Sequence, residues 1–322
     1  MNILRSVWRV ADSSSNGKGS IDWAAVSAAA KAATDPGSLD LSTADRDGYA
    51  SDVRDARERL QAVAEVEFDV PEVIEVQNRH HWIDANVETF HRIMLPLEEH
   101  GPTVLPGITR AINTGTFALV LSFLGNNVLG QYDPLLLADG DGDDDHGLYF
   151  VEPNIRRVAH SLDVDYPRFR RWIAFHEVSH AAEFGAAPWL STHLETRMER
   201  GIDALVEGDL DRDAFRELDT AMTAVEGYAE LLMDRAFDEE YGDLRRKLDE
   251  RRQGGGPIAK LARRFLGLGL KRRQYERGAR FFRYVADKRG VAAASRVWDH
   301  PENLPTDDEL DVPERWIARV SP

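Results

Sequence analysis

One stretch of the chain, residues 170–185 with the sequence RRWIAFHEVSHAAEFG, has the residue types and the spacing of a metal site. His176 and His180 are four residues apart, so on a helix both imidazoles lie on one face and can bind the same metal ion. Glu177 lies between them, where its carboxylate can take a proton from a metal-activated water. The same motif also arises by chance on helices, and a surface His-Glu-His cluster is the alternative.

A second pair of acids follows in residues 221–234, AMTAVEGYAELLMD, where the apolar residues have helical spacing. Glu226 and Glu230 are four residues apart on this segment, and a carboxylate on an apolar face is costly unless a cation compensates it. We therefore expect Glu226 to be the third metal ligand, which leaves the fourth position to water as in catalytic zinc sites. We expect Glu230 to accept the free ring N–H of a ligand histidine. The alternative is that both are solvated helix acids.

The segments that must position these residues are predicted to be mainly helical. Pro167, close after Asp165, is typical of a helix start, and Gly185 of a left-handed helix end. Residues 128–137 and 147–155 are rich in apolar and aromatic side chains and predict strands or a short hairpin. Further helices are expected at 22–33, 44–66, from Pro71 onward, and at 108–128, the last of them buried.

This pattern predicts a mainly α fold with a small β-sheet. Residues 1–20 are expected to be a flexible N-terminus, and residues 21–322 a single metallohydrolase domain. Within that domain, 21–110 would form an N-terminal helical layer and 111–322 the metal-site core. Near the C-terminus, Trp298 and Trp316 are expected to anchor an ordered, Pro-rich tail.

Composition limits the chemistry and the partners. The chain has no cysteine, so a metal ion must rely on histidines and carboxylates. The formal net charge of −16 argues against non-specific binding of nucleic acid. The most apolar stretch, 116–124, is too short to span a bilayer, and the N-terminus lacks the features of a signal peptide. We therefore expect a cytoplasmic protein with no membrane or nucleic-acid partner.

Three other groups of charged residues or histidines are expected to have structural roles and not to bind metal or substrate. The acidic loop 138–147 differs from a calcium loop, because Asp144 and Phe150 occupy the positions of the required Gly and Glu. The basic region 245–283, broken at 254–257, is expected to form two helices that pair with the acidic first half of the chain. Four upstream histidines are expected to be structural or exposed, because none pairs with a carboxylate at helical spacing: His80, His81, His91 and His100.

Several separate motifs resemble one known family, the zincin-like metallopeptidase type 2 family. They are HEVSHAAEFGAAPWLSTHL, VEGYAELLMD, LKRRQYERGARFF and WDHPENLPTDDEL, preceded by RHHWIDANVETFHRIMLPLE, VLGQYD and GLYFVEPNI. The resemblance extends from about Asp22 to Val320. It implies a zincin-like architecture with His176, His180 and Glu226 as zinc ligands and Glu177 as base. Members are commonly named hydrolases or proteins associated with biosynthesis of the deazaflavin coenzyme F-420.

The resemblance also suggests roles for residues outside the motif helix. His193 would follow that helix and line the cleft, where it could polarise a substrate carbonyl, although a surface histidine is the simpler interpretation. Tyr275 lies in a segment that matches the family strongly, and could donate a hydrogen bond to a tetrahedral oxyanion. In zincins generally, a strand beside the metal helix can hold the substrate backbone by strand addition. Leu148–Val151 is the candidate for this strand.

The expected function is that of a zinc-dependent hydrolase of the gluzincin type. It would cleave an amide or peptide bond with zinc-activated water, and Glu177 would be the general base. The substrate would be a peptide or a small amide, and the oligomeric state stays open. The alternative is a non-enzymatic or small-amide-processing accessory protein associated with deazaflavin coenzyme biosynthesis.

Overall fold

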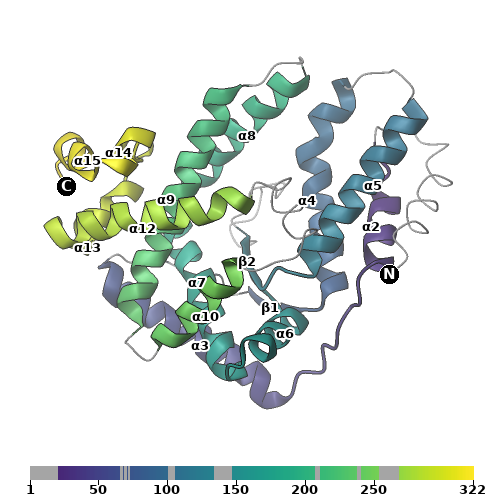
Figure 1. The fold of residues 1–322 in the computed structure, drawn as a ribbon, viewed down its shortest axis with the longest axis horizontal. Coiled ribbons are helices and arrows are strands. Elements are labelled where there is room, and N and C mark those ends of the chain that lie inside the picture. Colours follow the sequence, from purple (N-terminus) through teal and green to yellow (C-terminus); the bar gives the residue numbers. More distant parts are fainter. Residues whose placement is uncertain are drawn as a thin grey trace.

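The structure is a computed structural model that describes residues 21–65, 68, 71, 73–100, 106–133, 147–206, 211–237, 241–253 and 268–322. Within these residues the chain is mainly helical with one small three-stranded sheet, which confirms the predicted fold class (Figure 1). The N-terminus 1–20, expected to be flexible, and residues 138–146 of the acidic loop lie outside the described residues. None of the described helices is both long enough and apolar enough to cross a membrane.

The helices fall into two groups around the sheet. Before or between the strands come α2 (Trp23–Ala32), α3 (Thr43–Ala64), α4 (Arg79–His100) and α5 (Pro106–Gly125). After them follow α6 (Glu152–Leu162), α7 (Tyr166–Ala186), α8 (Leu190–Val206), α9 (Arg212–Ala236), α10 (Gly242–Gln253) and α12 (Leu268–Arg289). The C-terminal region has the short helices α13 (Val291–Ser295), α14 (Asp307–Asp311) and α15 (Pro313–Val320), with 3₁₀ turns at Arg296–Trp298 and Pro301–Asn303.

The central helix, α7, begins where the sequence predicts and ends slightly later. The Asp165 side chain caps it by accepting a hydrogen bond from the Arg168 amide at 3.1 Å, and Pro167 occupies the first turn. Gly185, expected to end the helix in a left-handed conformation, lies inside it instead. The helix continues through Ala186, and Ala187 follows with φ of −126°. This prediction was wrong because the chain turns into α8 without a left-handed residue.

The sheet consists of β1 (Val73–Gln77), β2 (Gly130–Asp133) and β3 (Gly147–Val151) in the order β1-β3-β2. β1 is parallel to β3, and β2 is antiparallel to it. The predicted strands are confirmed at 130–133 (β2) and 147–151 (β3), whereas residues 152–155 begin α6 and residues 134–137 lie outside the described residues. The helix expected from Pro71 was wrong at its start. β1 comes first, because pairing with a distant strand lets a short apolar segment form a strand.

The position of β3 in the sheet corrects one expectation about substrate binding. Leu148–Val151 was the candidate for strand addition, but β3 pairs with β1 on one side and with β2 on the other. A strand with two partners has no edge to offer to a peptide. Among the described strands, β2 and β1 are the edges, and β2 lies against α7.

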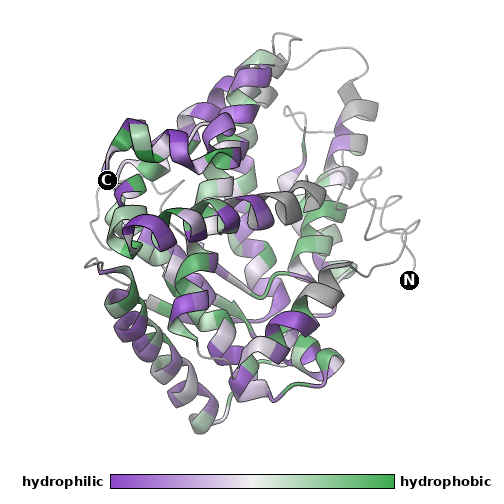
Figure 2. Cartoon of the chain, turned by 60° about the vertical axis from the view of Figure 1, so that its left-hand side comes forward, coloured by the Kyte–Doolittle hydropathy of each residue, from purple (hydrophilic) through white to green (hydrophobic). Residues whose placement is uncertain are grey.

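Two hydrophobic clusters hold these elements together. The larger one joins α3, α6, α7, α9 and α12 with the C-terminal helices, and the smaller one joins α2, α4 and α5. Figure 1 shows α2, α4 and α5 on one side of the sheet and α12 to α15 on the other. Hydrophobic and hydrophilic residues alternate around most of the helices, as expected when each buries one face (Figure 2). Trp298 and Trp316 are buried, which confirms them as anchors of the C-terminal segment.

The helix that carries Glu226 is packed tightly by α12. A Cβ atom added to Gly227 would lie 2.3 Å from the backbone carbon of Gly278, and one added to Gly278 would lie 2.2 Å from the Thr223 carbonyl oxygen. Only glycine allows two helix backbones to approach this closely. The two glycines therefore fix the crossing of α9 and α12 directly beside Glu226.

The described part of the basic region lies on α10 and α12, in agreement with the predicted helices, while residues 254–267, which include the predicted break, lie outside the described residues. For four of its described arginines, the expectation of partners in the acidic first half was wrong. Four arginines of this region have ion pairs with acids in the second half of the chain: Arg245 with Glu230 and Asp234, Arg277 with Asp307 and Asp311, Arg280 with Asp311, and Arg283 with Asp234. Helices that are close in sequence pack side by side here, so their charges meet locally.

Candidate metal centre

The metal motif lies on a helix that is held firmly in the core. Arg170, six residues before His176, donates to the Asp52 carboxylate of α3 at 2.6 Å, and both side chains are almost buried. Arg171 has an ion pair with Asp55 on the same helix. Burial of these charges is tolerated because each is paired. They therefore fix the position of α7 along α3.

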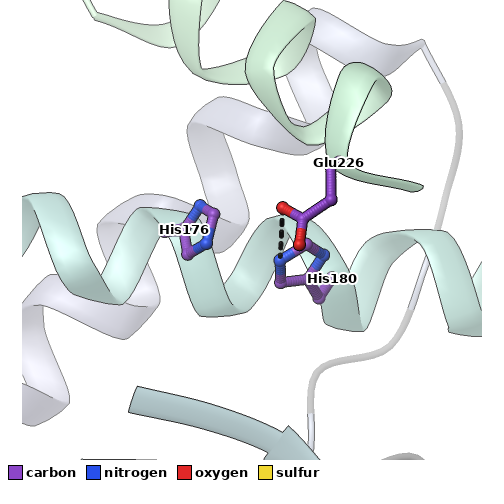
Figure 3. Close-up of side chains that lie close together, drawn as sticks. All are labelled: His176, His180 and Glu226. Atoms are coloured by element: carbon purple, nitrogen blue, oxygen red, sulfur yellow. Dashed lines mark ion pairs between the residues drawn. The ribbon is translucent and has the colours of Figure 1, made fainter. Parts of the chain in front are cut away.

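Three side chains converge between α7 and α9. One ligand atom each of His176, His180 and Glu226 lies within 4.8 Å of the others. Figure 3 shows the Glu226 carboxylate extending from α9 toward the two rings on α7, and the His180 Nε2 to Glu226 Oε2 distance is 4.0 Å. Within the part of the chain that the structure describes, this is the group of His and acidic side chains arranged to hold a metal ion.

The rings of the two histidines are held by their neighbours. Trp172, one turn before His176, stacks on that ring with centroids 5.8 Å apart and an angle of 4° between the planes. The His180 ring meets the His176 ring edge-on at 4.7 Å. Aromatic contacts of this kind restrict the ring torsions. Both imidazoles are thus oriented in advance of any ligand.

A buried acid that the sequence reasoning missed, Glu183, sets the tautomer of His180. Its side chain is completely buried, and its Oε2 lies 2.9 Å from His180 Nδ1. When Nδ1 carries the proton that it donates to Glu183, the lone pair of Nε2 faces Glu226 and is available to a metal. The signal in the sequence was its spacing, because residues three apart on a helix share a face.

Glu230, which was expected to orient a ligand histidine, is placed elsewhere. Its carboxylate has an ion pair with Arg245 of α10. The helical spacing of four residues from Glu226 put Glu230 on the correct side of α9. The following helix, α10, provides a guanidinium there. The carboxylate that reaches a ligand histidine belongs to Glu183 instead.

The centre carries an excess of negative charge. Burial alone would lower the pKa of His180, but the hydrogen bond to Glu183 and the charges of Glu183, Glu226 and Glu177 raise it to about 9. Burial raises the pKa of Glu183 to about 7, against the opposing effect of His180. Three carboxylates around one imidazole stabilise a positive charge at this point. The site is thus built to hold a cation.

Glu177 lies at the edge of the same centre and is buried, with 6% of its surface exposed. It is close enough to His180 for its charge to raise the pKa of that ring. On its other side it meets β2, because a Cβ atom built on Gly130 would lie 2.6 Å from Glu177 Oε1. The carboxylate therefore lies between the edge strand and the histidine pair.

Of the other two residues proposed for catalysis, His193 is not one of the three clustered side chains, and the structure does not describe where the Tyr275 side chain lies. His193 lies on α8 with its ring edge-on to Trp189 at 5.6 Å, and its charged neighbours are Arg197 and Glu217. Burial and the charge of Arg197 lower its pKa to about 4, so the ring is neutral at physiological pH. Tyr275 belongs to α12, one turn before Gly278, and its side chain lies outside the described residues.

The upstream histidines have the structural roles expected of them where the structure describes their side chains. His80 Nε2 lies 2.8 Å from the Thr34 carbonyl oxygen at the end of α2, and the ring of His91 packs against Trp23 at 5.3 Å. His81 is exposed, and the side chain of His100 lies outside the described residues. The rings of His80 and His91 contact backbone and aromatic groups away from the three clustered side chains of the metal centre.

The donor set fits zinc. Two imidazoles and one carboxylate are the ligand types of catalytic zinc sites, and such sites leave the remaining position to water. Glu226 is almost buried and both rings are partly buried, so the three donors can replace most of the hydration shell of a metal ion. The excess negative charge described above would be neutralised by a divalent cation. Glu183 supplies the carboxylate behind a ligand histidine that is common in zinc centres.

A helix with the His-Glu-x-x-His motif and a glutamate from a second helix together define a zincin-type metal centre. The model of the zincin-like metallopeptidase family matches residues 21–209 and 204–317. The chain therefore belongs to the zincin-like metallopeptidase family, as the sequence motifs predicted.

A solved structure supports the same relationship. It is the crystal structure of a protein from Chloroflexus aurantiacus described as "a putative hydrolase with a novel fold". The two chains are 32% identical, with a TM-score of 0.77, and the match covers 94% of this chain and 99% of the other. No protein with a curated description matches the chain.

Proposed function

We propose that this protein is a zinc-dependent hydrolase that cleaves an amide or peptide bond. The observation that carries the proposal is the convergence of His176, His180 and Glu226 beside the buried carboxylate of Glu177. Membership of the zincin-like metallopeptidase family and the similarity to a protein described as a hydrolase support it. A purely structural metal site would use four protein ligands and would need no Glu177.

Each residue has a distinct task in this proposal. His176, His180 and Glu226 would hold the metal, and Glu183 would keep Nε2 of His180 available to it. Bound zinc would lower the pKa of water and polarise a substrate carbonyl. Glu177 would take the proton from the attacking water and pass it to the leaving nitrogen. The position of Glu177, buried beside the histidine pair, favours this role.

The edge strand β2 is the proposed place for the substrate backbone. The Val151 amide donates to the Leu129 carbonyl at 2.9 Å, and Gly130 is opposite Phe150. In an antiparallel ladder, the residue next to a hydrogen-bonded pair points its N–H and C=O away from the partner strand. The main-chain groups of Gly130 are thus directed away from β3, beside Glu177. An extended peptide could pair there.

A cleavage screen tests the proposal. Zinc-loaded protein would be incubated with a peptide library and with a set of small amides, which separates peptide hydrolysis from small-amide hydrolysis. We expect Glu177→Gln to retain zinc and to lose turnover by about 10²- to 10⁴-fold, the usual contribution of a general base. Glu199→Gln, at an exposed position on α8, is the matched control and should behave as wild type. Equal turnover of the wild type and Glu177→Gln would contradict the mechanism.

A further inference from the structure

The first residue of β2, Gly130, touches the side chain of the proposed general base. A Cβ atom built on Gly130 would lie 2.6 Å from both Cγ and Oε1 of Glu177 and 2.7 Å from its Cδ. Real Cβ atoms essentially never approach heavy atoms this closely, so one of the two groups would have to move. The absence of a side chain at 130 is what allows the carboxylate to occupy its position.

This contact differs from the close contacts of Gly227 and Gly278. The crossing of α9 and α12 brings Gly227 and Gly278 against backbone atoms, which cannot move without separating two helices. At Gly130 the three nearest atoms all belong to the flexible side chain of Glu177. A methyl group at this position would therefore displace the carboxylate and leave the helix backbone in place.

The strand itself is held on two sides and cannot easily move away. Leu129, next to Gly130, accepts a hydrogen bond from the Val151 amide of β3. Tyr132, two residues after Gly130, packs its ring against Phe184 of α7 with centroids 5.5 Å apart. Phe184 lies seven residues after Glu177, on the same face of α7. Both the strand and the helix are fixed, so the carboxylate is the group that would shift.

We propose that Gly130 is a positioning residue for Glu177: the backbone of β2 forms the wall against which the carboxylate rests, beside the histidine pair. The catalytic consequence rests on the proposed function, whereas the positional claim does not. Restoring a normal contact of about 3.4 Å would move the carboxylate by about 1 Å. A misplacement of this size can lower a catalytic rate by about 10²-fold.

The test compares Gly130→Ala with Gly115→Ala, because a Cβ atom at Gly115 on α5 meets no atom within 4 Å. The crystal structure of Gly130→Ala should have the Glu177 carboxylate displaced and the backbones of α7 and β2 unchanged. Zinc affinity should equal that of wild type in both variants. If turnover is found, kcat of Gly130→Ala should fall by about 10- to 100-fold, with KM changed less. Gly115→Ala should have wild-type kinetics.

A double-mutant cycle separates this role from a general effect on folding. If Gly130 acts through Glu177, Gly130→Ala should lower the thermal unfolding midpoint less in a Glu177→Ala background than in wild type. It should also cause no further loss of turnover in a Glu177→Gln background.

A carboxylate that stays in place in the Gly130→Ala structure, or equal stability losses in both backgrounds, would overturn the inference. Neither readout depends on a known substrate. Failure of the proposed function would be recognised differently, by the absence of zinc or of turnover in the wild-type protein.

Discussion

Replacement of Glu183 by glutamine is the sharpest test of the centre's construction, because Glu183 was not apparent as a functional residue in the sequence. Its carboxylate is completely buried and lies 2.9 Å from His180 Nδ1. Glutamine has nearly the same shape and keeps a carbonyl oxygen that can accept the same hydrogen bond. The substitution therefore removes the charge and little else.

The size of the effect follows from that contact. A hydrogen bond to a charged group contributes about 1.5–3 kcal/mol, roughly twice the value of a neutral one. Glu183→Gln should thus weaken the hydrogen bond between His180 Nδ1 and residue 183 by about 1–2 kcal/mol. This corresponds to a loss of about 5- to 30-fold in zinc affinity. The range agrees with the loss of about 10- to 100-fold typical of such carboxylates.

Zinc affinity would be measured by competition with a chromophoric chelator at fixed pH. Glu230→Gln is the matched control, because Glu230 lies on the other metal helix but pairs with Arg245. We expect Glu183→Gln to bind zinc more weakly and Glu230→Gln to bind it as wild type does. The reverse result would refute the assignment of Glu183, and would return the role to the residue that the sequence suggested.

Three further predictions concern stability. Asp52→Ala should cost about 3–5 kcal/mol in a denaturant titration, because it leaves Arg170 buried without its partner at 2.6 Å. Gly278→Ala should lower stability by about 1–3 kcal/mol or more in thermal unfolding, since its methyl group would meet the Thr223 carbonyl oxygen. The pKa of His193 is lowered from 6.5 to about 4 by burial and by a neighbouring arginine, so the unfolded state binds more protons between these values. Stability should therefore fall as the pH decreases from about 6.5 to 4, by about 1 kcal/mol after allowance for solvent screening.

Controls for these predictions are available in the same chain. Gly242→Ala, where a Cβ atom would meet nothing within 4 Å, should be close to wild type in stability. His193→Gln should remove the part of the stability loss between about pH 6.5 and 4 that arises from His193. If His193→Gln has the same pH profile of stability as wild type, the assignment of a partly buried, neutral His193 is refuted. Asp52→Ala with wild-type stability would mean that its ion pair makes no net contribution.

Much of the fold could be predicted from local patterns. Helical spacing and a capping aspartate identified the start of α7, and alternating apolar residues identified β2 and β3. β1 was missed because a five-residue strand depends on pairing with β3, more than 70 positions later in the chain. Likewise, whether a strand lies at the edge of a sheet depends on which other strands pair with it in the folded chain. For this reason β3, which lies between β1 and β2, was mistaken for a substrate-binding edge strand.

For the metal centre, the sequence indicated the residue types but not all of their partners. His176, His180 and Glu226 were named from helical spacing, and the structure brings their ligand atoms together. Glu183 and Glu230 are both glutamates on apolar helices, and spacing alone does not say which one reaches a histidine. The difference arises from α10, which provides Arg245 to Glu230. The position of α10 beside α9 decided this assignment.

The central claim, that two helices together hold one zinc ion, is tested most directly by the zinc content of purified variants. Elemental analysis after equilibrium dialysis against zinc should give a stoichiometric ion for wild type and for Glu177→Gln. It should give strongly reduced zinc for His176→Ala and Glu226→Ala. Full zinc occupancy in Glu226→Ala, with unchanged affinity, would contradict the account, because the ion would then be held without α9.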